Sequence, residues 1–586
     1  HSTTVAGVAN TWGYGAMTNS YNDMQNTKCA LYIGSNAAEA HPVSVLHMLH
    51  AKETGAKMIV VDPRFTRTAA RADEYVRIRS GSDIPFLFGM LYHIFKNGWE
   101  DKKYINDRVY GMDQIKADVM ANWTPDKVEE ACGVNEAQMY KVAEMMAKSK
   151  PATIVWCMGQ TQHTIGNAMV RASCILQLAL GNIGISGGGA NIFRGHCNVQ
   201  GATDVGPNPD SLPGYYGVAE GSWKHWCRVW GLDYEYVQSR YAEGMITKGG
   251  MTVSRWVDGV LENPELIDQK AGNLRGLFFW GHAPNSQTRG LDMKRAMDKL
   301  ELLVVVDPYP SATAAMAAMP PAAGGAVNKN RGVYLLPATT QFECVGSVTA
   351  SNRSIQWREK VIDPLFESVP DHVIMQALAD KLGFGKELSK NFKMMDSKFA
   401  GKTWKEPEVE SILREINQAV WTIGYTGHTP ERLKAHMRMM SVFDPKTLRS
   451  RGGKDPVTGY DTAGDYFGLP WPCYGNAALK HPGSPNLYDT SKHVMDGGGN
   501  FRANFGVEKD GKSLLAADGS YSKGADIKTG YPEVDHVMLK KLGWWNELTE
   551  DEKKAAEGKN WKTDLSGGII RVTMKNHGCH PFGNAK

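Results

Sequence analysis

The chain has 586 residues, more than one hydrophobic core supports, so we expect roughly three or four domains or one elaborated domain. Hydrophobic residues make up 42% and charged residues 22%, ordinary globular values that exclude a disordered or fibrous protein. The net charge of +4 is nearly balanced, no dense basic tract indicates nucleic-acid binding, and no apolar run approaches the ~18 residues of a membrane-spanning helix.

The first predicted elements are a strand, a helix and a second strand. Residues 30–36 and 57–64 are short apolar runs typical of strands, and apolar residues between 41 and 55 recur at helical spacing. This order predicts a βαβ unit, whose two strands pair in parallel.

The turn after the first strand and the end of the second strand are candidate ligand sites. Pro42 suits the first turn of a helix, and Gly34, Ser35 and Asn36 before it predict free backbone amides that would bind an anion. Asp62 closes the second strand, where carboxylates of nucleotide-binding folds bind ribose hydroxyls or guanine nitrogens. An ordinary turn aspartate is the alternative interpretation of Asp62.

The same pattern recurs along the chain. Residues 152–163 and 167–182 predict a strand and a helix, and residues 274–285 and 300–314 each predict a strand followed by a polar turn. Two doubly wound halves, each with a Val-Val-Asp-Pro strand end, suit a chain that binds two nucleotide-like ligands. A single NAD-binding domain is the alternative, but no Gly-x-Gly-x-x-Gly motif follows a predicted strand.

The rest of the chain has weaker signals. Residues 365–570 predict an insertion of exposed loops and short helices, with one helical stretch at 408–420. The nine cysteines stand singly, without a Cys-x-x-Cys pair, which argues against a disulfide framework, a zinc ribbon or an iron–sulfur site within these residues.

Residues 191–215 have neither helical nor strand periodicity and are rich in glycine, asparagine and aspartate. Such a segment predicts an irregular loop, and loops of this kind often carry binding sites. Arg194 is its candidate functional residue. Taken alone, Arg194 would be interpreted as a surface arginine in a salt bridge.

Six segments together resemble the catalytic subunit of molybdenum or tungsten formate dehydrogenases, members of the dimethyl-sulfoxide-reductase superfamily. They are residues 1–20, 33–42, 60–84, 156–167, 180–206 and 278–285. The resemblance covers residues 1–360 densely and the remainder loosely. It implies an α/β fold of two doubly wound αβα lobes around a bis-pterin cofactor, with an irregular C-terminal region of helices and loops.

The resemblance also implies a domain division and the cofactors. Residues 1–196 would form the first pterin-dinucleotide lobe, 197–345 the second, and 346–586 an irregular region leading to a C-terminal cap domain outside the chain. The cofactor would be bis-molybdopterin guanine dinucleotide with molybdenum or tungsten. A 4Fe–4S cluster would lie in an N-terminal domain, also outside the chain.

In the family, a selenocysteine or cysteine binds the metal immediately before a histidine that matches His1. We therefore expect no metal ligand within the chain, and we expect a fragment that is inactive alone. His1 would hold the proton released from formate or orient the metal ligand, since its imidazole titrates near neutrality. Arg194 matches the substrate arginine, whose planar guanidinium can donate two parallel hydrogen bonds to formate.

The remaining site residues are cofactor contacts implied by the resemblance. One dinucleotide would be bound by Gly34, Asn36, Asp62, Arg64, Gly81, Ser82 and Asp83, and the other by Gly281, Asn285 and Asp307. Gly159, Gln160, Gln162, His163, Gly195 and His196 would border the pterin rings. A plain polar turn is the alternative for Gln160, Gln162 and His163.

The function implied is oxidation of formate to carbon dioxide, or the reverse. Electrons would pass to an iron–sulfur subunit, and a membrane cytochrome subunit is a further expected partner. We expect a periplasmic location, with the cytoplasm as the alternative. Two other functions stay open: another molybdopterin oxidoreductase, such as a nitrate reductase, or an inactive cofactor-binding fragment.

Overall fold

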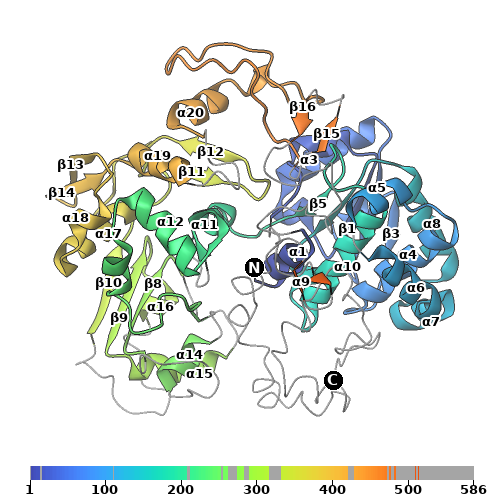
Figure 1. Cartoon of the computed structure of the whole chain (residues 1–586), viewed down its shortest axis with the longest axis horizontal. Coiled ribbons are helices and arrows are strands. Elements are labelled where there is room, and N and C mark those ends of the chain that lie inside the picture. Colours follow the sequence, from blue (N-terminus) through green and yellow to red (C-terminus); the bar gives the residue numbers. More distant parts are fainter. Residues whose placement is uncertain are drawn as a thin grey trace.

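The computed structural model describes most of the chain up to residue 470. The described ranges are 2–12, 16–109, 111–206, 211–251, 255–261, 274–282, 289–315, 332–419 and 428–470, with short strands at 474–476, 481–483, 508–509 and 512–513. Figure 1 shows β1 to β5 with α3 to α10 on one side of the molecule, and β8 to β10 with α11 to α18 on the other. Among these residues, no helix has the length and apolar character needed to cross a membrane.

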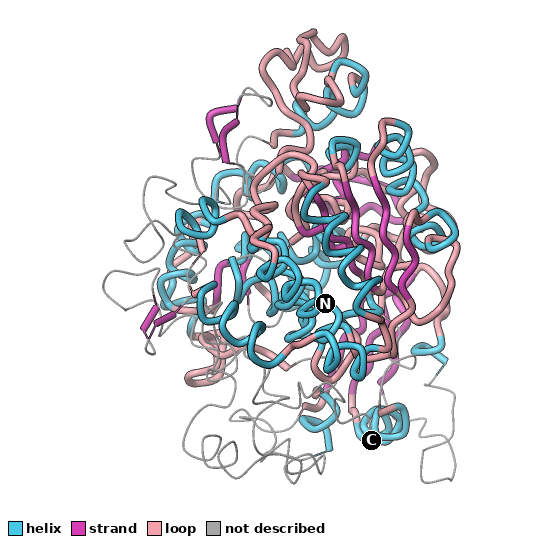
Figure 2. Tube along the Cα trace, turned by 90° about the vertical axis from the view of Figure 1, so that its right-hand side faces the viewer, coloured by secondary structure: helices cyan, strands magenta, loops and turns pink. Residues whose placement is uncertain are grey.

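A five-stranded parallel sheet forms the centre of the first part, in the order β3-β2-β1-β4-β5. Its strands are β1 (Cys29–Ile33), β2 (Lys57–Val61), β3 (Glu74–Val76), β4 (Ala152–Trp156) and β5 (Ala190–Ile192). Every residue of β1 and β4 is buried, as expected for parallel strands covered on both faces. Figure 2 shows the strands side by side, with helices on either side.

The sequence predicts two of the helices around this sheet, those at 41–55 and 167–182, and the other helices were not predicted. The full set is α1 (Ser2–Trp12), α2 (Ala37–Ala40), α3 (Pro42–Glu53), α4 (Asp83–Lys96), α5 (Lys102–Arg108), α6 (Met112–Asn122), α7 (Pro125–Cys132), α8 (Glu136–Lys148), α9 (Met158–Thr161) and α10 (Gly166–Ala179). The predicted βαβ unit is confirmed, with Pro42 as the first residue of α3. Helix α1 packs against α10 so closely that a Cβ on Gly7 would lie 2.6 Å from Val170 Cγ1.

A second parallel sheet has the order β10-β9-β8. Its elements, with the neighbouring helices, are α11 (Val199–Val205), α12 (Glu220–Trp230), α13 (Tyr234–Gln238), α14 (Trp256–Leu261), β8 (Gly276–Trp280), α15 (Gly290–Lys299), β9 (Leu302–Asp307), α16 (Ala312–Ala315) and β10 (Gly332–Pro337). Leu303 and Val305 pack into one hydrophobic cluster, whereas Val304 and Val306 pack into another. Both faces of β9 are therefore covered. Two separate α/β sheets agree with the expected fold class, while the predicted domain boundaries stay a prediction.

Residues 346–470 contain more strands than the sequence predicts. The elements are β11 (Gly346–Thr349), β12 (Ile355–Arg358), α17 (Asp371–Leu382), α18 (Gly385–Leu388), β13 (Met394–Phe399), β14 (Lys402–Pro407), α19 (Val409–Ala419) and α20 (Pro430–Arg438). The helix predicted at 408–420 is confirmed. The hairpins β11–β12 and β13–β14 correct the expectation of loops and short helices, because their largely polar, half-exposed strands carry no clear apolar alternation.

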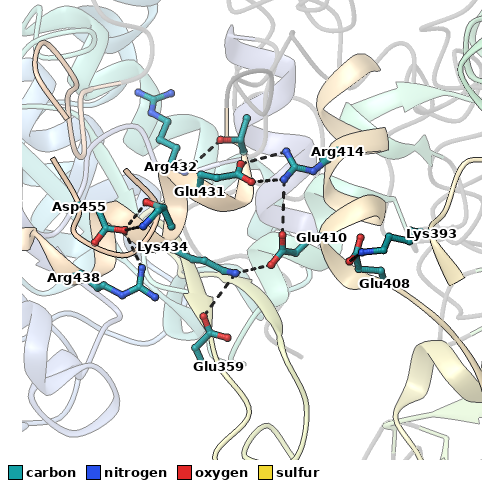
Figure 3. A network of polar contacts seen from close by, with 12 residues as sticks. Glu359, Lys393, Glu408, Glu410, Arg414, Glu431, Arg432, Lys434, Arg438 and Asp455 are labelled. Atoms are coloured by element: carbon teal, nitrogen blue, oxygen red, sulfur yellow. Dashed lines mark hydrogen bonds and ion pairs between the residues drawn. The ribbon is translucent and has the colours of Figure 1, made fainter. Parts of the chain in front are cut away.

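Charged side chains connect this region internally (Figure 3). Lys434 of α20 contacts Glu410 of α19 at 2.5 Å and Glu359, which follows β12, at 4.0 Å. Arg414 of α19 binds Glu431 of α20. Single surface ion pairs contribute little, but this linked set fixes α19 and α20 against the β11–β12 hairpin.

Candidate active site

The turns after β1 and β4 meet at the carboxyl edge of the first sheet. Gly34 has a φ of +60°, and a Cβ there would lie 2.7 Å from the backbone nitrogen of Gln160. The amide of Gly159 donates to the carbonyl of Gly34 at 3.1 Å. Ser35, the residue after Gly34, is buried, and its Oγ has no hydrogen-bond partner among the described residues. Ligands of open α/β sheets bind at this edge.

The predicted free amides are only partly present at this turn. The Gly34 amide donates to the carbonyl of Val61 at 3.1 Å, so the prediction is wrong for Gly34, because the pairing of β1 with β2 extends to it. The side chain of Asn36 donates to Glu39 Oε2 at 2.5 Å and accepts from Thr68 Oγ1 at 3.0 Å. Asn36 thus shapes the turn through its side chain, and its contact with a cofactor stays a prediction.

The start of α4 places a buried carboxyl group beside an open turn. Gly81 has a φ of +84°, and nothing lies within 4 Å of a Cβ built there. The hydroxyl of Ser82 donates to the carbonyl of Arg79 at 2.6 Å, which stabilises this turn. Asp83 is only 3% exposed, and burial, with a smaller contribution from the nearby Asp62, raises its pKa to about 7. A carboxyl group in this state suits a ligand that brings hydrogen-bond donors.

The predicted pterin contacts after β4 differ in exposure. Gln160 is fully buried, and its Nε2 donates to Ser173 Oγ at 2.8 Å, so in this structure its side chain packs against α10. Gln162 is exposed. A ring nitrogen of His163 lies 2.9 Å from the carbonyl oxygen of Gly159. Gly159, Gln162 and His163 stay candidates for the cofactor edge, whereas Gln160 is engaged inside the protein.

Residues 193–198, which we call the Arg194 loop, follow β5. The Phe193 amide donates to the carbonyl of Trp156 at 3.1 Å, which continues the pairing of β5 with β4. A ring nitrogen of His41, at the start of α3, lies 2.6 Å from the carbonyl oxygen of Arg194. The Arg194 amide donates to Ser351 Oγ at 3.1 Å. The backbone of Arg194 is therefore held from two sides.

The guanidinium of Arg194 is held by α11. Its Nη1 donates to Thr203 Oγ1 at 2.8 Å and lies 3.4 Å from the carbonyl oxygen of Val199. Gly195 and His196 are exposed, and nothing lies within 4 Å of a Cβ built on Gly195. The loop thus places an oriented cation beside an open stretch of backbone.

The second sheet repeats the arrangement of the first. Gly281 has a φ of +58°, and its amide donates to the carbonyl of Val306 at 2.8 Å. Asp307 Oδ1 accepts from the Tyr309 amide at 3.0 Å. In the first sheet, Asp62 Oδ1 likewise accepts from the amide of the exposed Arg64 at 2.8 Å.

The Arg194 loop lies close to the turn after β8. Burial lowers the pKa of His282, and the charge of the nearby His196 lowers it further. The structure thus brings His196 of the loop to the edge of the second sheet. His1 and Asn285 lie outside the described residues, so their roles stay predictions.

The repeat around the two Asp-Pro pairs is longer than the sequence analysis recognised. Residues 62–70 and 307–315 both read Asp-Pro-x-x-Ser/Thr-x-Thr-Ala-Ala. The two repeated threonines, Thr68 and Thr313, are both fully buried. Thr68 Oγ1 reaches the turn after β1, and Thr313 Oγ1 donates to the carbonyl of His282 after β8 at 3.4 Å. This spacing was the signal that could have identified the two threonines and Ser311, whose Oγ is shielded from solvent.

Several features fit a large polar ligand at these edges. The Oγ atoms of Ser35 and Ser311 are shielded from solvent and have no partner among the described residues. A Cβ built on Gly81, Gly195 or Gly281 would meet open space. Within all the residues that the structure describes, no group of three His, Cys, Asp or Glu side chains is arranged to hold a metal ion.

A family model and individual relatives both assign the chain to one protein family. Residues 3–381 match the family model of molybdopterin oxidoreductases. The chain is 33% identical over 435 residues to F420-dependent formate dehydrogenase subunit alpha of Methanocaldococcus jannaschii, covering 74% of this chain and 56% of that protein. It is 31% identical over 387 residues to formate dehydrogenase H of Escherichia coli, covering 66% of this chain and 49% of that protein. The chain thus spans about half the length of these relatives.

A solved structure supports the fold. Acetylene hydratase from Pelobacter acetylenicus matches 74% of this chain with a TM-score of 0.50 and 20% sequence identity. The match covers 54% of that chain. At this identity, the likeness concerns the fold alone.

Proposed function

Because the chain belongs to the molybdopterin oxidoreductase family, we propose that it oxidises formate to carbon dioxide, or catalyses the reverse reaction, at a molybdenum or tungsten pterin centre. The similarity of this chain to formate dehydrogenases, two of which are described above, supports formate as the substrate. The observation that carries the proposal is the position of Arg194, an oriented guanidinium in the loop that follows β5 of the first sheet.

The residues that would hold the cofactor lie at the two sheet edges. Gly34, Asp62, Gly81 and Asp83 would bind one pterin guanine dinucleotide, with Asn36, Arg64 and Ser82 shaping its turns. Gly281, Asn285 and Asp307 would bind the other. When bound, the cofactor supplies a metal centre that accepts the two electrons of formate oxidation. The hydroxyls of Ser35 and Ser311, for which the described residues offer no partner, would gain hydrogen bonds there.

Arg194 would bind and orient the substrate. Formate is a small planar anion, and a guanidinium matches it with two parallel donors and a charge that cannot be lost. The hydrogen bond to Thr203 restricts rotation of the guanidinium, which reduces the cost of orienting formate. His1 would hold the proton released in the reaction.

The electrons would leave through an iron–sulfur cluster to a partner subunit, with a membrane cytochrome subunit as a further partner. A periplasmic enzyme is the arrangement that we propose, with a cytoplasmic one as the alternative. Gel filtration of the native complex, followed by identification of its subunits, tests the partners directly.

Substitution of Arg194 in the complete enzyme tests the function. We expect Arg194→Ala to lower kcat/KM for formate by about 10³-fold, because formate would enter a desolvated site without its counter-charge. Arg194→Lys should both raise KM and lower kcat, since lysine keeps the charge but loses the two-pronged geometry. The measurement is formate-dependent dye reduction, with metal and pterin content determined in each variant.

Arg295→Ala is the matched control, because this arginine is exposed on α15 and, within the part of the chain that the structure describes, forms a surface ion pair with Asp292. It should retain wild-type kinetics. Unchanged formate turnover in a fully metallated Arg194→Ala variant would refute the assigned role. Nitrate reduction without formate oxidation would favour another oxidoreductase, and a complete protein without metal would favour a cofactor-binding fragment.

A further inference from the structure

We propose that the turn between β11 and β12, residues 350–354, positions the substrate arginine, with Ser351 as the positioning residue and Arg353 as the anchor of the turn. The inference rests on the proposed role of Arg194. The hairpin lies at the start of residues 346–586, which the resemblance implies to be an irregular region, and it lies beside α11 (Figure 1).

Ser351 binds both backbone groups of Arg194. Its Oγ accepts from the Arg194 amide at 3.1 Å and donates to the Arg194 carbonyl at 3.3 Å. The same carbonyl oxygen lies 2.6 Å from a ring nitrogen of His41. The peptide groups of Arg194 are therefore clamped between the hairpin and the start of α3, which fixes the direction in which the guanidinium leaves the loop.

A second contact holds the other end of the Arg194 loop. Asn198 has a φ of +59°, a conformation that asparagine tolerates better than most residues. Its Oδ1 accepts from the amide of Thr349 at 2.9 Å, the last residue of β11. A Cβ on Gly201 would lie 2.1 Å from this Oδ1, so the glycine leaves room for the contact. Both ends of the loop are thus bonded to one hairpin.

Arg353 connects the same turn to the segment that follows α1. Its Nε donates to the Met17 carbonyl at 2.6 Å, and its Nη2 donates to the Thr18 carbonyl at 2.8 Å and to the Leu469 carbonyl at 3.2 Å. Charge-assisted bonds of this kind are stronger than neutral ones. One turn therefore holds both the Arg194 loop and the segment at Met17 and Thr18.

This arrangement has a consequence for the reaction. Small displacements of an orienting group reduce the rate more than they reduce binding, because only the reacting geometry is lost. Loss of the Ser351 hydroxyl should thus act on kcat as well as on KM, without removing any cofactor contact.

Ser351→Ala in the complete holoenzyme is the central test. We expect about a fivefold to tenfold lower kcat/KM for formate at unchanged metal and pterin content. A loss of this size is what removal of one hydrogen bond typically causes. Hydrogen exchange at the Arg194 amide should accelerate, because its acceptor is gone. Ser351→Thr, which keeps the hydroxyl, should restore both properties.

Ser354→Ala is the matched control. It makes the same change three residues away in the same turn, where the hydroxyl is shielded and has no partner among the described residues. It should leave kinetics and exchange at wild-type values. Ser351 also forms a hydrogen bond with the side chain of Tyr21. Tyr21→Phe removes this contact alone and should change the kinetics and the amide exchange little.

A double substitution shows whether Ser351 acts through Arg194. In the Arg194→Lys background, Ser351→Ala should cause less than its own fivefold to tenfold loss, because the oriented guanidinium is already gone. Equal losses in both backgrounds, an effect of Tyr21→Phe matching that of Ser351→Ala, or unchanged exchange at Arg194 would overturn the inference. Absence of formate oxidation in the wild-type holoenzyme would instead overturn the proposed function, while the exchange measurement would still test the contact.

Discussion

The turn after β1 and the turn after β8 share one backbone conformation in different surroundings. Gly34 and Gly281 have φ values of +60° and +58°, and each donates its amide to the end of the neighbouring strand. A Cβ on Gly34 would meet the backbone of the turn after β4, whereas a Cβ on Gly281 would meet nothing within 4 Å. Strand pairing therefore sets the repeated geometry. The strand β4, which has no counterpart beside β8 among the described residues, sets the packing around Gly34.

The buried carboxyl groups that follow the third strand of each sheet differ in a similar way. Burial raises the pKa of Asp83 to about 7. Burial also acts on Glu343, but hydrogen bonds from Thr340, Leu365 and Ser368 outweigh it and lower the pKa of Glu343. Glu343 is thus satisfied within the protein, while Asp83 is the carboxyl group that gains most from a donor on a ligand.

The largest expected difference between the two turns comes from adding one methyl group. We expect Gly34→Ala to destabilise the protein by about 3 kcal/mol or more, because left-handed strain of about 1–2 kcal/mol adds to a backbone overlap. Gly281→Ala should cost only the strain, about 1 kcal/mol. Urea unfolding of the cofactor-free protein, followed by circular dichroism, measures both.

Gly55→Ala provides the control for this pair, since Gly55 has a φ of +93° and open space around it, far from either turn. Its effect should match that of Gly281→Ala. Equal destabilisation by Gly34→Ala and Gly281→Ala would mean that the contact between the turns after β1 and β4 contributes nothing to stability.

The stability of the protein should depend on pH through Asp83. The folded-state pKa of Asp83 lies above its usual 3.8, so its favourable contribution is complete below about pH 4 and is lost as the pH rises to about 7. In the cofactor-free protein, Asp83→Asn should therefore become more stabilising, relative to wild type, by about 3 kcal/mol between pH 5 and pH 8. Urea unfolding at the two pH values gives this difference.

Glu343→Gln should show the opposite dependence. The lowered pKa of Glu343 means that its contribution is present above its usual range and is lost as the pH falls through the folded-state value. The variant should be destabilised most at neutral pH and least in acid. The same sign for both variants would contradict the contrast between the two carboxyl groups.

Local patterns predicted much of the fold. The strands β1, β2, β4, β8 and β9 are apolar runs that end in turn residues, and α3 and α10 carry helical spacing and a first-turn proline or a terminal glycine. Asp62 and Asp307 were predicted from their strand ends, although their contacts with a cofactor came only from the resemblance. Short or polar elements, such as β3 and the β13–β14 hairpin, gave too little periodicity to be recognised.

Long-range contacts of the site could not be predicted in this way. Ser351 and Arg194 are 157 positions apart, and no local pattern connects them. Gln160 shows the converse, because the resemblance implies a contact with the pterin rings, whereas in this structure its side chain is buried and donates to Ser173. Local sequence patterns predict which residues lie at the edge of a sheet. The residues that they contact there depend on the whole fold.

The smallest expected difference concerns the repeated threonines, both fully buried. Thr68 Oγ1 accepts from the Ala38 amide at 2.9 Å and donates to Asn36 at 3.0 Å, whereas Thr313 Oγ1 donates to His282 across a longer 3.4 Å. Valine has nearly the same shape, so burial changes equally at both sites. Thr68→Val should cost about 1–2 kcal/mol, since a backbone donor loses its partner, and Thr313→Val about 0.5 kcal/mol. Equal shifts in the urea midpoint would show that the threonines stabilise both turns through packing, and that the sequence repeat reflects shape more than hydrogen bonding.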